Sequence, residues 1–108
     1  MRDPAAVAVV LIGGDVDLET SADVAETIQQ AVDLRPPVLV LDLTDVSFLS
    51  SIGLSVLIET KEETSKAGVV LRLVASQRAV LHPMQITGLT AFFDIYPTVA
   101  EAQSATVS

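Results

Sequence analysis

The stretch that most constrains the fold is a continuous apolar segment that leads into two serines and then into a helical pattern. Residues 38–43 carry one polar side chain, Asp42, which is typical of a central strand covered on both faces. Ser50 and Ser51 follow, and behind them apolar residues recur at helical spacing. The serines therefore lie at a strand-to-helix junction, where backbone N–H groups lack intrahelical partners and favour an anion such as phosphate.

Strand-like and helix-like patterns alternate along the whole chain. The predicted strands cover residues 7–12, 38–43, 69–74 and 92–96, and the predicted helices run from Thr20 or Ser21 to Asp33 and over residues 52–66, 76–86 and 98–104. Such alternation calls for a mostly parallel sheet with helices packed on it. We therefore expect one α/β domain over residues 1–108, with a mostly parallel, mixed central sheet of roughly four to five strands and about four helices.

Five residues lead to more local predictions. Gly13 and Gly14 supply the permissive backbone for a turn after the first strand. Arg72 interrupts the third apolar run, which predicts a position near an edge or a rim of the sheet. Ser76 can cap the third helix, and Pro83 either kinks that helix or marks its first turn.

Charge and cysteine content limit the partners and the setting. Lys and Arg total six against fourteen Asp and Glu, a formal net charge of −8, so nucleic acid is not expected as a partner. The charge either keeps a small domain soluble or attracts a positively charged protein surface. The lack of cysteine excludes disulfides and fits a cytoplasmic protein. Residues 5–12 resemble a buried strand more than a signal peptide, and no apolar run has the length of a membrane span.

Acidic residues follow the first predicted strand without a basic residue among them. The carboxyl ends of parallel strands meet at one edge of a sheet, so we expect this loop and the helix behind it to border the two serines. The sequence thus predicts an acidic rim around a serine-bearing helix N-terminus, made by Asp15, Asp17, Glu19, Asp23 and Glu26.

The sequence offers little for catalysis or for a bound group. Serine hydrolysis needs a base, and the single histidine, His82, accompanies no Gly-x-Ser-x-Gly motif. One His without Cys argues against zinc, the acidic run lacks the pattern of a calcium loop, and Gly13-Gly14 makes no phosphate-binding loop. We expect no enzyme, no metal and no cofactor. The serine pair keeps two interpretations, a helix N-cap and a phosphorylation switch.

Three ordered motifs resemble those of a STAS domain of the anti-sigma factor antagonist (anti-anti-sigma factor) type, across nearly the whole chain. The family has a Gly-acid-apolar-Asp turn, a Phe-apolar-Asp-Ser-hydroxyl-Gly-Leu junction, and a Thr-Gly-Leu element before a Phe-containing strand. The matching segments here are Gly14-Asp15-Val16-Asp17, Phe48-Leu49-Ser50-Ser51-Ile52-Gly53-Leu54, Thr87-Gly88-Leu89 and Phe92-Phe93-Asp94-Ile95-Tyr96.

The resemblance implies a function in bacterial transcription regulation. Such an antagonist binds an anti-sigma factor with serine kinase activity and frees the sigma factor; phosphorylation switches the binding off, and a serine phosphatase restores it. By this resemblance Ser51 is the phosphorylated residue. The residues expected to meet the partner are Asp15, Asp17, Glu19, Ser21, Asp23, Ser50, Ser51, Ile52, Gly53 and Leu54.

The chain departs from the family pattern beside the expected phosphorylation site. Ser50 stands where the family has Asp, and Ile52 stands where it has a hydroxyl residue, so Ser50 is an alternative acceptor or the helix cap. The additional N-terminal strand common in the family is expected to be short or missing. A second hypothesis is a STAS interaction or ligand-sensing module that binds its partner without phosphorylation control.

Overall fold

A computed structural model describes residues 7–105, in which strands and helices alternate as the sequence predicts. The elements are β1 (Val7–Val16), α1 (Ser21–Asp33), β2 (Val38–Leu49), α2 (Ser51–Ala67), β3 (Val70–Val74), α3 (Arg78–Ile86), a short 3₁₀ helix η2 (Leu89–Ala91), β4 (Ile95–Tyr96) and α4 (Val99–Ser104).

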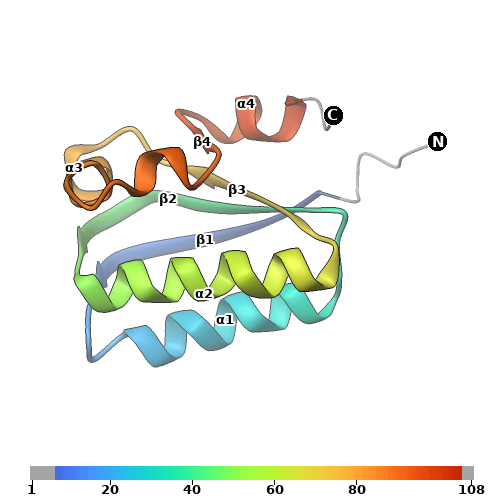
Figure 1. Cartoon of the computed structure of the whole chain (residues 1–108), viewed down its shortest axis with the longest axis horizontal. Coiled ribbons are helices and arrows are strands. Elements are labelled where there is room, and N and C mark those ends of the chain that lie inside the picture. Colours follow the sequence, from blue (N-terminus) through green and yellow to red (C-terminus); the bar gives the residue numbers. More distant parts are fainter. Residues whose placement is uncertain (1–6, 106–108) are drawn as a thin grey trace.

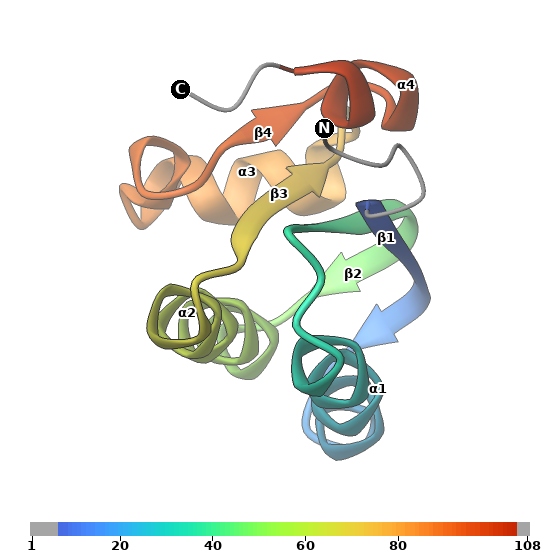
Figure 2. The same ribbon diagram turned by 90° about the vertical axis from the view of Figure 1, so that its right-hand side faces the viewer.

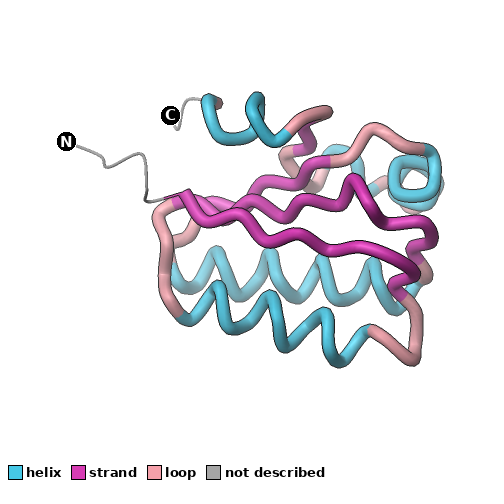
Figure 3. Tube along the Cα trace, turned by 180° about the vertical axis from the view of Figure 1, so that it is seen from behind, coloured by secondary structure: helices cyan, strands magenta, loops and turns pink. Residues whose placement is uncertain are grey.

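The strands form one sheet in the order β1-β2-β3-β4, and all three pairings among the described residues are parallel. Helices α1 and α2 lie side by side on one face, and α3 and α4 lie on the other side of the sheet (Figures 1 and 2). The view from behind shows the same layers, with the strands between the helices (Figure 3). This confirms the predicted α/β fold, and residues 7–105 contain four strands and four α-helices. The N-terminal strand common in the family would fall on residues that lie outside the described ones.

The buried core has two parts because β2 is covered on both faces. Leu39 and Leu41 belong to the larger cluster, which includes residues of α1 and α2. Val38 and Val40 point the other way, into a smaller cluster that includes Ala102 of α4. The alternation follows from strand geometry, in which successive side chains point to opposite faces. The prediction of a central strand covered on both faces is confirmed.

Strand β1 is longer than predicted, because the chain does not turn at its glycine pair. Gly13 and Gly14 lie within the strand, and the pairing with β2 shifts between Leu11 and Gly13 and again after Gly14. Gly14 has a φ of 75°, a conformation that side-chain-bearing residues rarely adopt. The irregular stretch keeps β1 paired up to Val16, which brings the end of this strand to the end of β2.

The prediction that Ser76 caps the third helix is wrong. Helix α3 starts at Arg78 with Gln77 at its N-cap position. The side-chain nitrogen of Gln77 donates to the carbonyl oxygens of Leu43, Thr44 and Val46 at 2.7, 3.2 and 3.0 Å, respectively. Gln77 thus fixes the start of α3 to the second half of β2.

The last predicted strand is also shorter than expected. The segment after Gly88 first forms η2, so only Ile95 and Tyr96 pair with β3. Pro83 lies inside α3 and does not mark its first turn. Within residues 7–105, no helix combines the length and the apolar character needed to cross a membrane.

Arg72 does not lie at an edge or rim of the sheet, contrary to the prediction. It belongs to β3, an inner strand, and only 3% of its surface is exposed. Its guanidinium donates to the carbonyl oxygen of Ala102 at 2.8 Å and lies 5.9 Å from the centre of the Tyr96 ring. A cation at the C-terminal end of a helix is favourable. Arg72 therefore ties α4 to the sheet.

We expect the substitution Arg72→Ala to lower the free energy of unfolding by about 2–4 kcal/mol, since it removes a buried hydrogen bond and leaves a cavity. Arg78→Ala is the matched control, because Arg78 is exposed and should change stability by less than about 0.5 kcal/mol. Urea unfolding followed by circular dichroism measures both values. Equal effects of the two substitutions would show that the Ala102 contact does not stabilise the fold.

Candidate functional site

The site is built where β1 and β2 end together. Val16 pairs with Leu49, the last residue of β2, and the backbone N–H of Ser50 donates to the Val16 carbonyl oxygen at 3.0 Å. Helix α2 begins at the next residue. The two serines are thereby placed at the carboxyl edge of a parallel sheet, the edge at which α/β folds meet their ligands and partners.

Ser50 is the N-cap of α2. Its Oγ accepts a hydrogen bond from the Gly53 N–H at 3.2 Å and donates one to the Val16 carbonyl oxygen at 2.9 Å. Its backbone is extended, with φ −81° and ψ 173°, as expected for a residue that precedes the first helical turn. Ser50 is only partly exposed, and its hydroxyl already has both a donor and an acceptor role.

Ser51 is the first residue of α2 and is exposed. Its carbonyl oxygen accepts from the Ser55 hydroxyl at 3.1 Å, whereas its own hydroxyl has no hydrogen-bond partner among residues 7–105. The helix N-cap interpretation of the serine pair therefore applies to Ser50. Ser50 fills the structural position, and the Ser51 hydroxyl is open to solvent or to a partner.

The next turn of α2 seats the helix on β1. A Cβ atom at Gly53 would lie 2.6 Å from Leu49 Cδ1, 2.9 Å from Val16 Cγ1 and 3.0 Å from the Val16 carbonyl oxygen, so a larger residue would force these side chains or the helix to shift. Leu54 is buried in the main core. Of the residues expected to meet a partner, Gly53 and Leu54 are therefore buried and position the site.

The loop from β1 to α1 is held by its own polar groups. The Asp17 carboxylate accepts from the N–H groups of Glu19 and Thr20 at 3.0 and 3.2 Å, respectively. The Thr20 hydroxyl donates to the Asp15 carbonyl oxygen at 2.7 Å and accepts from the Asp17 N–H at 3.0 Å. Ser21 is half-buried and donates to the Leu18 carbonyl oxygen at 3.3 Å. Asp17, Thr20 and Ser21 thus shape the loop.

Asp15 is the acidic residue that the structure brings directly to the end of β2. It pairs with Phe48 across the strands, and its carboxylate accepts from the Ser47 hydroxyl at 2.8 Å. Glu19 and Asp23 are exposed at the loop and the first turn of α1, while Glu26 lies about one turn further along that helix. The predicted acidic rim therefore begins with Asp15 beside the end of β2, and its other members continue along the loop and α1, away from that point.

Exposed apolar side chains lie in the same region, and two of them, Phe48 and Leu18, were not among the predicted site residues. Phe48 is 53% exposed and Ile52 is 37% exposed on either side of the serine pair, and Leu18 in the β1–α1 loop is 74% exposed. Aromatic residues are enriched at protein interfaces. In the sequence, the signal for Phe48 is an aromatic residue in the short stretch between the apolar run (residues 38–43) and the two serines. We call Phe48, Ser51 and Ile52 the serine-end surface.

Among the described residues, no group of His, Asp and Glu is arranged to hold a metal ion. His82 is exposed on α3. The chemistry that the serine-end surface itself offers is a free hydroxyl at a helix N-terminus, with exposed apolar residues three positions before it and one position after it in the chain.

Comparisons with known proteins agree with this geometry. The model of the STAS domain family matches residues 1–102. RsfB, an anti-sigma-F factor antagonist of Mycobacterium tuberculosis (strain ATCC 25618 / H37Rv), is 39% identical over 105 residues, which cover 94% of this chain and 83% of RsfB. The crystal structure of an anti-sigma factor antagonist from Mycobacterium paratuberculosis is 37% identical, with a TM-score of 0.85 over 94% of this chain and 86% of that one.

A more distant solved structure supports the fold alone. The anti-sigma factor antagonist SpoIIAA in its unphosphorylated form is 18% identical, with a TM-score of 0.73 over 89% of this chain and 84% of that one. The chain belongs to the STAS family, in the group of anti-sigma factor antagonists. This group consists of non-enzymatic regulators of transcription, so the chain is not an enzyme.

The division between the serines predicts different effects on stability. Ser50→Ala should lower the free energy of unfolding by about 1 kcal/mol or slightly more, because it removes the N-cap bond and the bond to Val16. Ser51→Ala should change it by less than about 0.5 kcal/mol, since an exposed hydroxyl without a partner is lost. Chemical denaturation of the two variants in parallel provides the measurement. A larger loss for Ser51→Ala would reverse the assignment of the cap.

Proposed function

We propose that this chain, as a single domain over residues 1–108, binds an anti-sigma factor through its serine-end surface and is released when Ser51 is phosphorylated. The observation that carries the proposal is the division of roles at the junction: the Ser50 hydroxyl is occupied by two hydrogen bonds, and the Ser51 hydroxyl is exposed without one. RsfB is named an anti-sigma-F factor antagonist, and the partner class is carried over from that likeness.

Phosphate on Ser51 is compatible with the fold. It would sit at the N-terminus of a long helix, where N–H groups and the helix dipole favour negative charge. The cap bonds of Ser50 do not involve the Ser51 side chain, so the start of α2 keeps its support. Modification is therefore expected to change the surface and leave the backbone in place.

The same phosphate opposes docking. A partner that covers the serine-end surface has to remove water from Ser51 as well as from Phe48 and Ile52. A group carrying about −1.5 to −2 charges resists this desolvation, and its neighbours on the β1–α1 loop are acidic. Each 1.4 kcal/mol of lost binding free energy is a tenfold loss in affinity.

The switch requires other proteins. The proposed partner is an anti-sigma factor with serine kinase activity, which phosphorylates Ser51, and a serine phosphatase would restore binding. The proposed setting is the cytoplasm, where ATP and the transcription machinery meet. Nucleic acid and membranes are not proposed as partners, because the formal net charge of −8 repels anionic surfaces.

A second candidate function is a STAS module that binds its partner without phosphorylation control, or that senses a small ligand. It is favoured by Ser50 and Ile52, which replace an acidic and a hydroxyl residue of the family pattern beside Ser51. The exposed Phe48 and Ile52 would serve as a docking surface whether or not Ser51 is modified.

We expect a cognate anti-sigma factor kinase with ATP to add one phosphate, mapped to Ser51 by intact-mass and peptide analysis. Ser51→Ala should abolish the added mass, and Ser50→Ala should retain it, because the Ser50 hydroxyl is held against Val16. Phosphate mapped to Ser50 in the wild-type protein would assign the switch to Ser50 instead of Ser51. If the kinase adds no phosphate, and Ser51→Asp binds the anti-sigma factor as tightly as the wild-type protein does, the second candidate function is favoured.

Phe48→Ala is expected to weaken binding of the anti-sigma factor roughly five- to thirtyfold, as truncation of a central aromatic interface residue does. The matched control is Leu34→Ala, because Leu34 is 84% exposed and lies at the opposite end of α1 from the β1–α1 loop. Isothermal titration calorimetry compares the dissociation constants. A similar loss for both variants would place the interface elsewhere.

A further inference from the structure

The second half of β2 buries its side chains at a spacing that a regular strand does not produce. Leu43, Val46 and Leu49 lie three positions apart and are buried in the main core cluster, and the two residues in each interval between them are exposed. In a regular strand the side chains alternate, so every second residue faces the same side. Each interval of β2 therefore contains one residue more than regular alternation allows.

The pairing with β1 places the second additional residue at Ser47. Val46 pairs with Gly14, and Phe48 pairs with the next residue of β1, Asp15. Ser47 is thus left without a partner on β1, which makes it a bulge, and a bulge re-aims the side chains around it. Strict alternation from the buried Val46 would bury Phe48 as well, whereas with the bulge Phe48 is 53% exposed.

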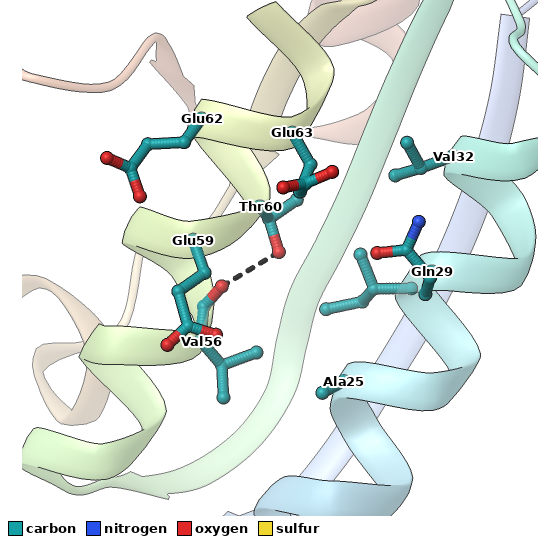
Figure 4. A pocket seen from close by; sticks show the side chains of 9 residues that line it. Ala25, Gln29, Val32, Val56, Glu59, Thr60, Glu62 and Glu63 are labelled. Atoms are coloured by element: carbon teal, nitrogen blue, oxygen red, sulfur yellow. Dashed lines mark hydrogen bonds between the residues drawn. The ribbon is translucent and has the colours of Figure 1, made fainter. Parts of the chain in front are cut away.

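The direction of the Phe48 side chain matters because the interior of the protein is already filled. Figure 4 shows Val56 of α2 and Val32 of α1 pointing into the space between these helices, and both are buried in the same cluster as Val46 and Leu49. A docking protein can contact the ring of Phe48 only where that ring is exposed. The bulge therefore decides whether Phe48 belongs to the serine-end surface.

One hydrogen bond between side chains joins this bulge to β1. The Ser47 hydroxyl donates to the Asp15 carboxylate at 2.8 Å. Asp15 is also the residue that pairs with Phe48, so the bond ties the additional residue to the partner of the residue that points outward. Within residues 7–105, no Lys or Arg lies within ion-pair distance of Asp15. The contact that Asp15 makes in the folded chain is therefore to Ser47.

The first bulge of β2 is supported in the same manner. The Gln77 side chain donates to the carbonyl oxygens of Leu43, Thr44 and Val46, which lie at and just after the first shift of the pairing with β1. A bulge disrupts the hydrogen bonds between strands, so a side chain from outside the strand can take up the backbone groups left over. Each irregular interval of β2 is thus held by one polar side chain from another element.

We propose that Asp15 is a positioning residue of the docking surface: by accepting the Ser47 hydroxyl, it keeps Ser47 as the bulged residue and holds Phe48 outward. This role rests on the proposed function, in which Phe48 meets the anti-sigma factor. Asp15 then serves partner binding through an acceptor oxygen at a fixed place, and its negative charge is not the feature that the partner contacts.

The strand pairing is measured first without a partner, as cross-strand nuclear Overhauser effects from position 15 in the isotope-labelled full chain. Asp15→Ala and Ser47→Ala should each weaken the contact to Phe48 at least about twofold and create a contact to position 47, because loss of one hydrogen bond shifts such an equilibrium roughly two- to tenfold. Asp15→Asn should keep the wild-type pattern, since its amide oxygen can accept the same bond. Glu62→Ala is the control, because it removes the same charge at an exposed position of α2 and should leave the pairing unchanged.

Binding of the anti-sigma factor is then compared by isothermal titration calorimetry. Asp15→Ala and Ser47→Ala should weaken it about two- to tenfold, while Asp15→Asn and Glu62→Ala should leave it within about twofold of the wild-type value. When Phe48→Ala is already present, Asp15→Ala should add less than about twofold, because the side chain that it positions is gone and the two effects are coupled.

Unchanged pairing in both Asp15→Ala and Ser47→Ala would overturn the role of Asp15, whatever the binding data are. Asp15→Asn with wild-type pairing but with binding as weak as that of Asp15→Ala would also overturn it, since the charge itself would then be the contact. An Asp15→Ala loss that is equally large with and without Phe48 would do the same. If Asp15→Ala changes the pairing but Phe48→Ala does not weaken binding, Asp15 still positions Phe48, and it is the proposed docking surface that fails.

Discussion

The carbonyl oxygen of Val16 is the atom on which the site depends. It accepts hydrogen bonds from both the backbone N–H and the hydroxyl of Ser50, at 3.0 and 2.9 Å, respectively. These bonds fix the end of β1, the end of β2 and the start of α2 in one place. The close approach is possible because Gly53 has no side chain to push the helix from Val16 and Leu49. Buried backbone groups need partners, so this small set of contacts satisfies the junction and at the same time aims Ser51 outward.

Much of this arrangement could be predicted from the sequence. The apolar run, the alternating elements and the family motifs gave a parallel α/β sheet with a serine at a helix start, and the ends of α1 and α2 were close to those observed. Which serine caps the helix could not be predicted from the sequence, because both candidates are serines and serine is a good N-cap at either position. Only the extended backbone conformation of Ser50, before the first helical residue, identifies it as the cap. It also misplaced the end of β1, since a glycine pair after an apolar run usually marks a turn, whereas here it lies in an irregular stretch of the strand.

The remaining differences arise from contacts between residues far apart in the chain. Arg72 interrupts an apolar strand, and nothing near it in sequence shows that a helix C-terminus will meet its guanidinium in a buried position. Gln77 falls within the predicted third helix, yet its side-chain amide donates to three carbonyl groups of β2. The exposure of Phe48 likewise depends on where β2 ends. Each of these depends on residues far apart in the chain and overrides a local expectation.

The separation of the structural serine from the exposed serine matters for how a switch can work here. If one hydroxyl both capped α2 and accepted phosphate, modification would remove the bond to Val16 and loosen the junction that positions the docking surface. With Ser50 retaining the cap, a phosphate on Ser51 would act on the exposed surface alone, through its charge and through the cost of removing water from it when a partner docks.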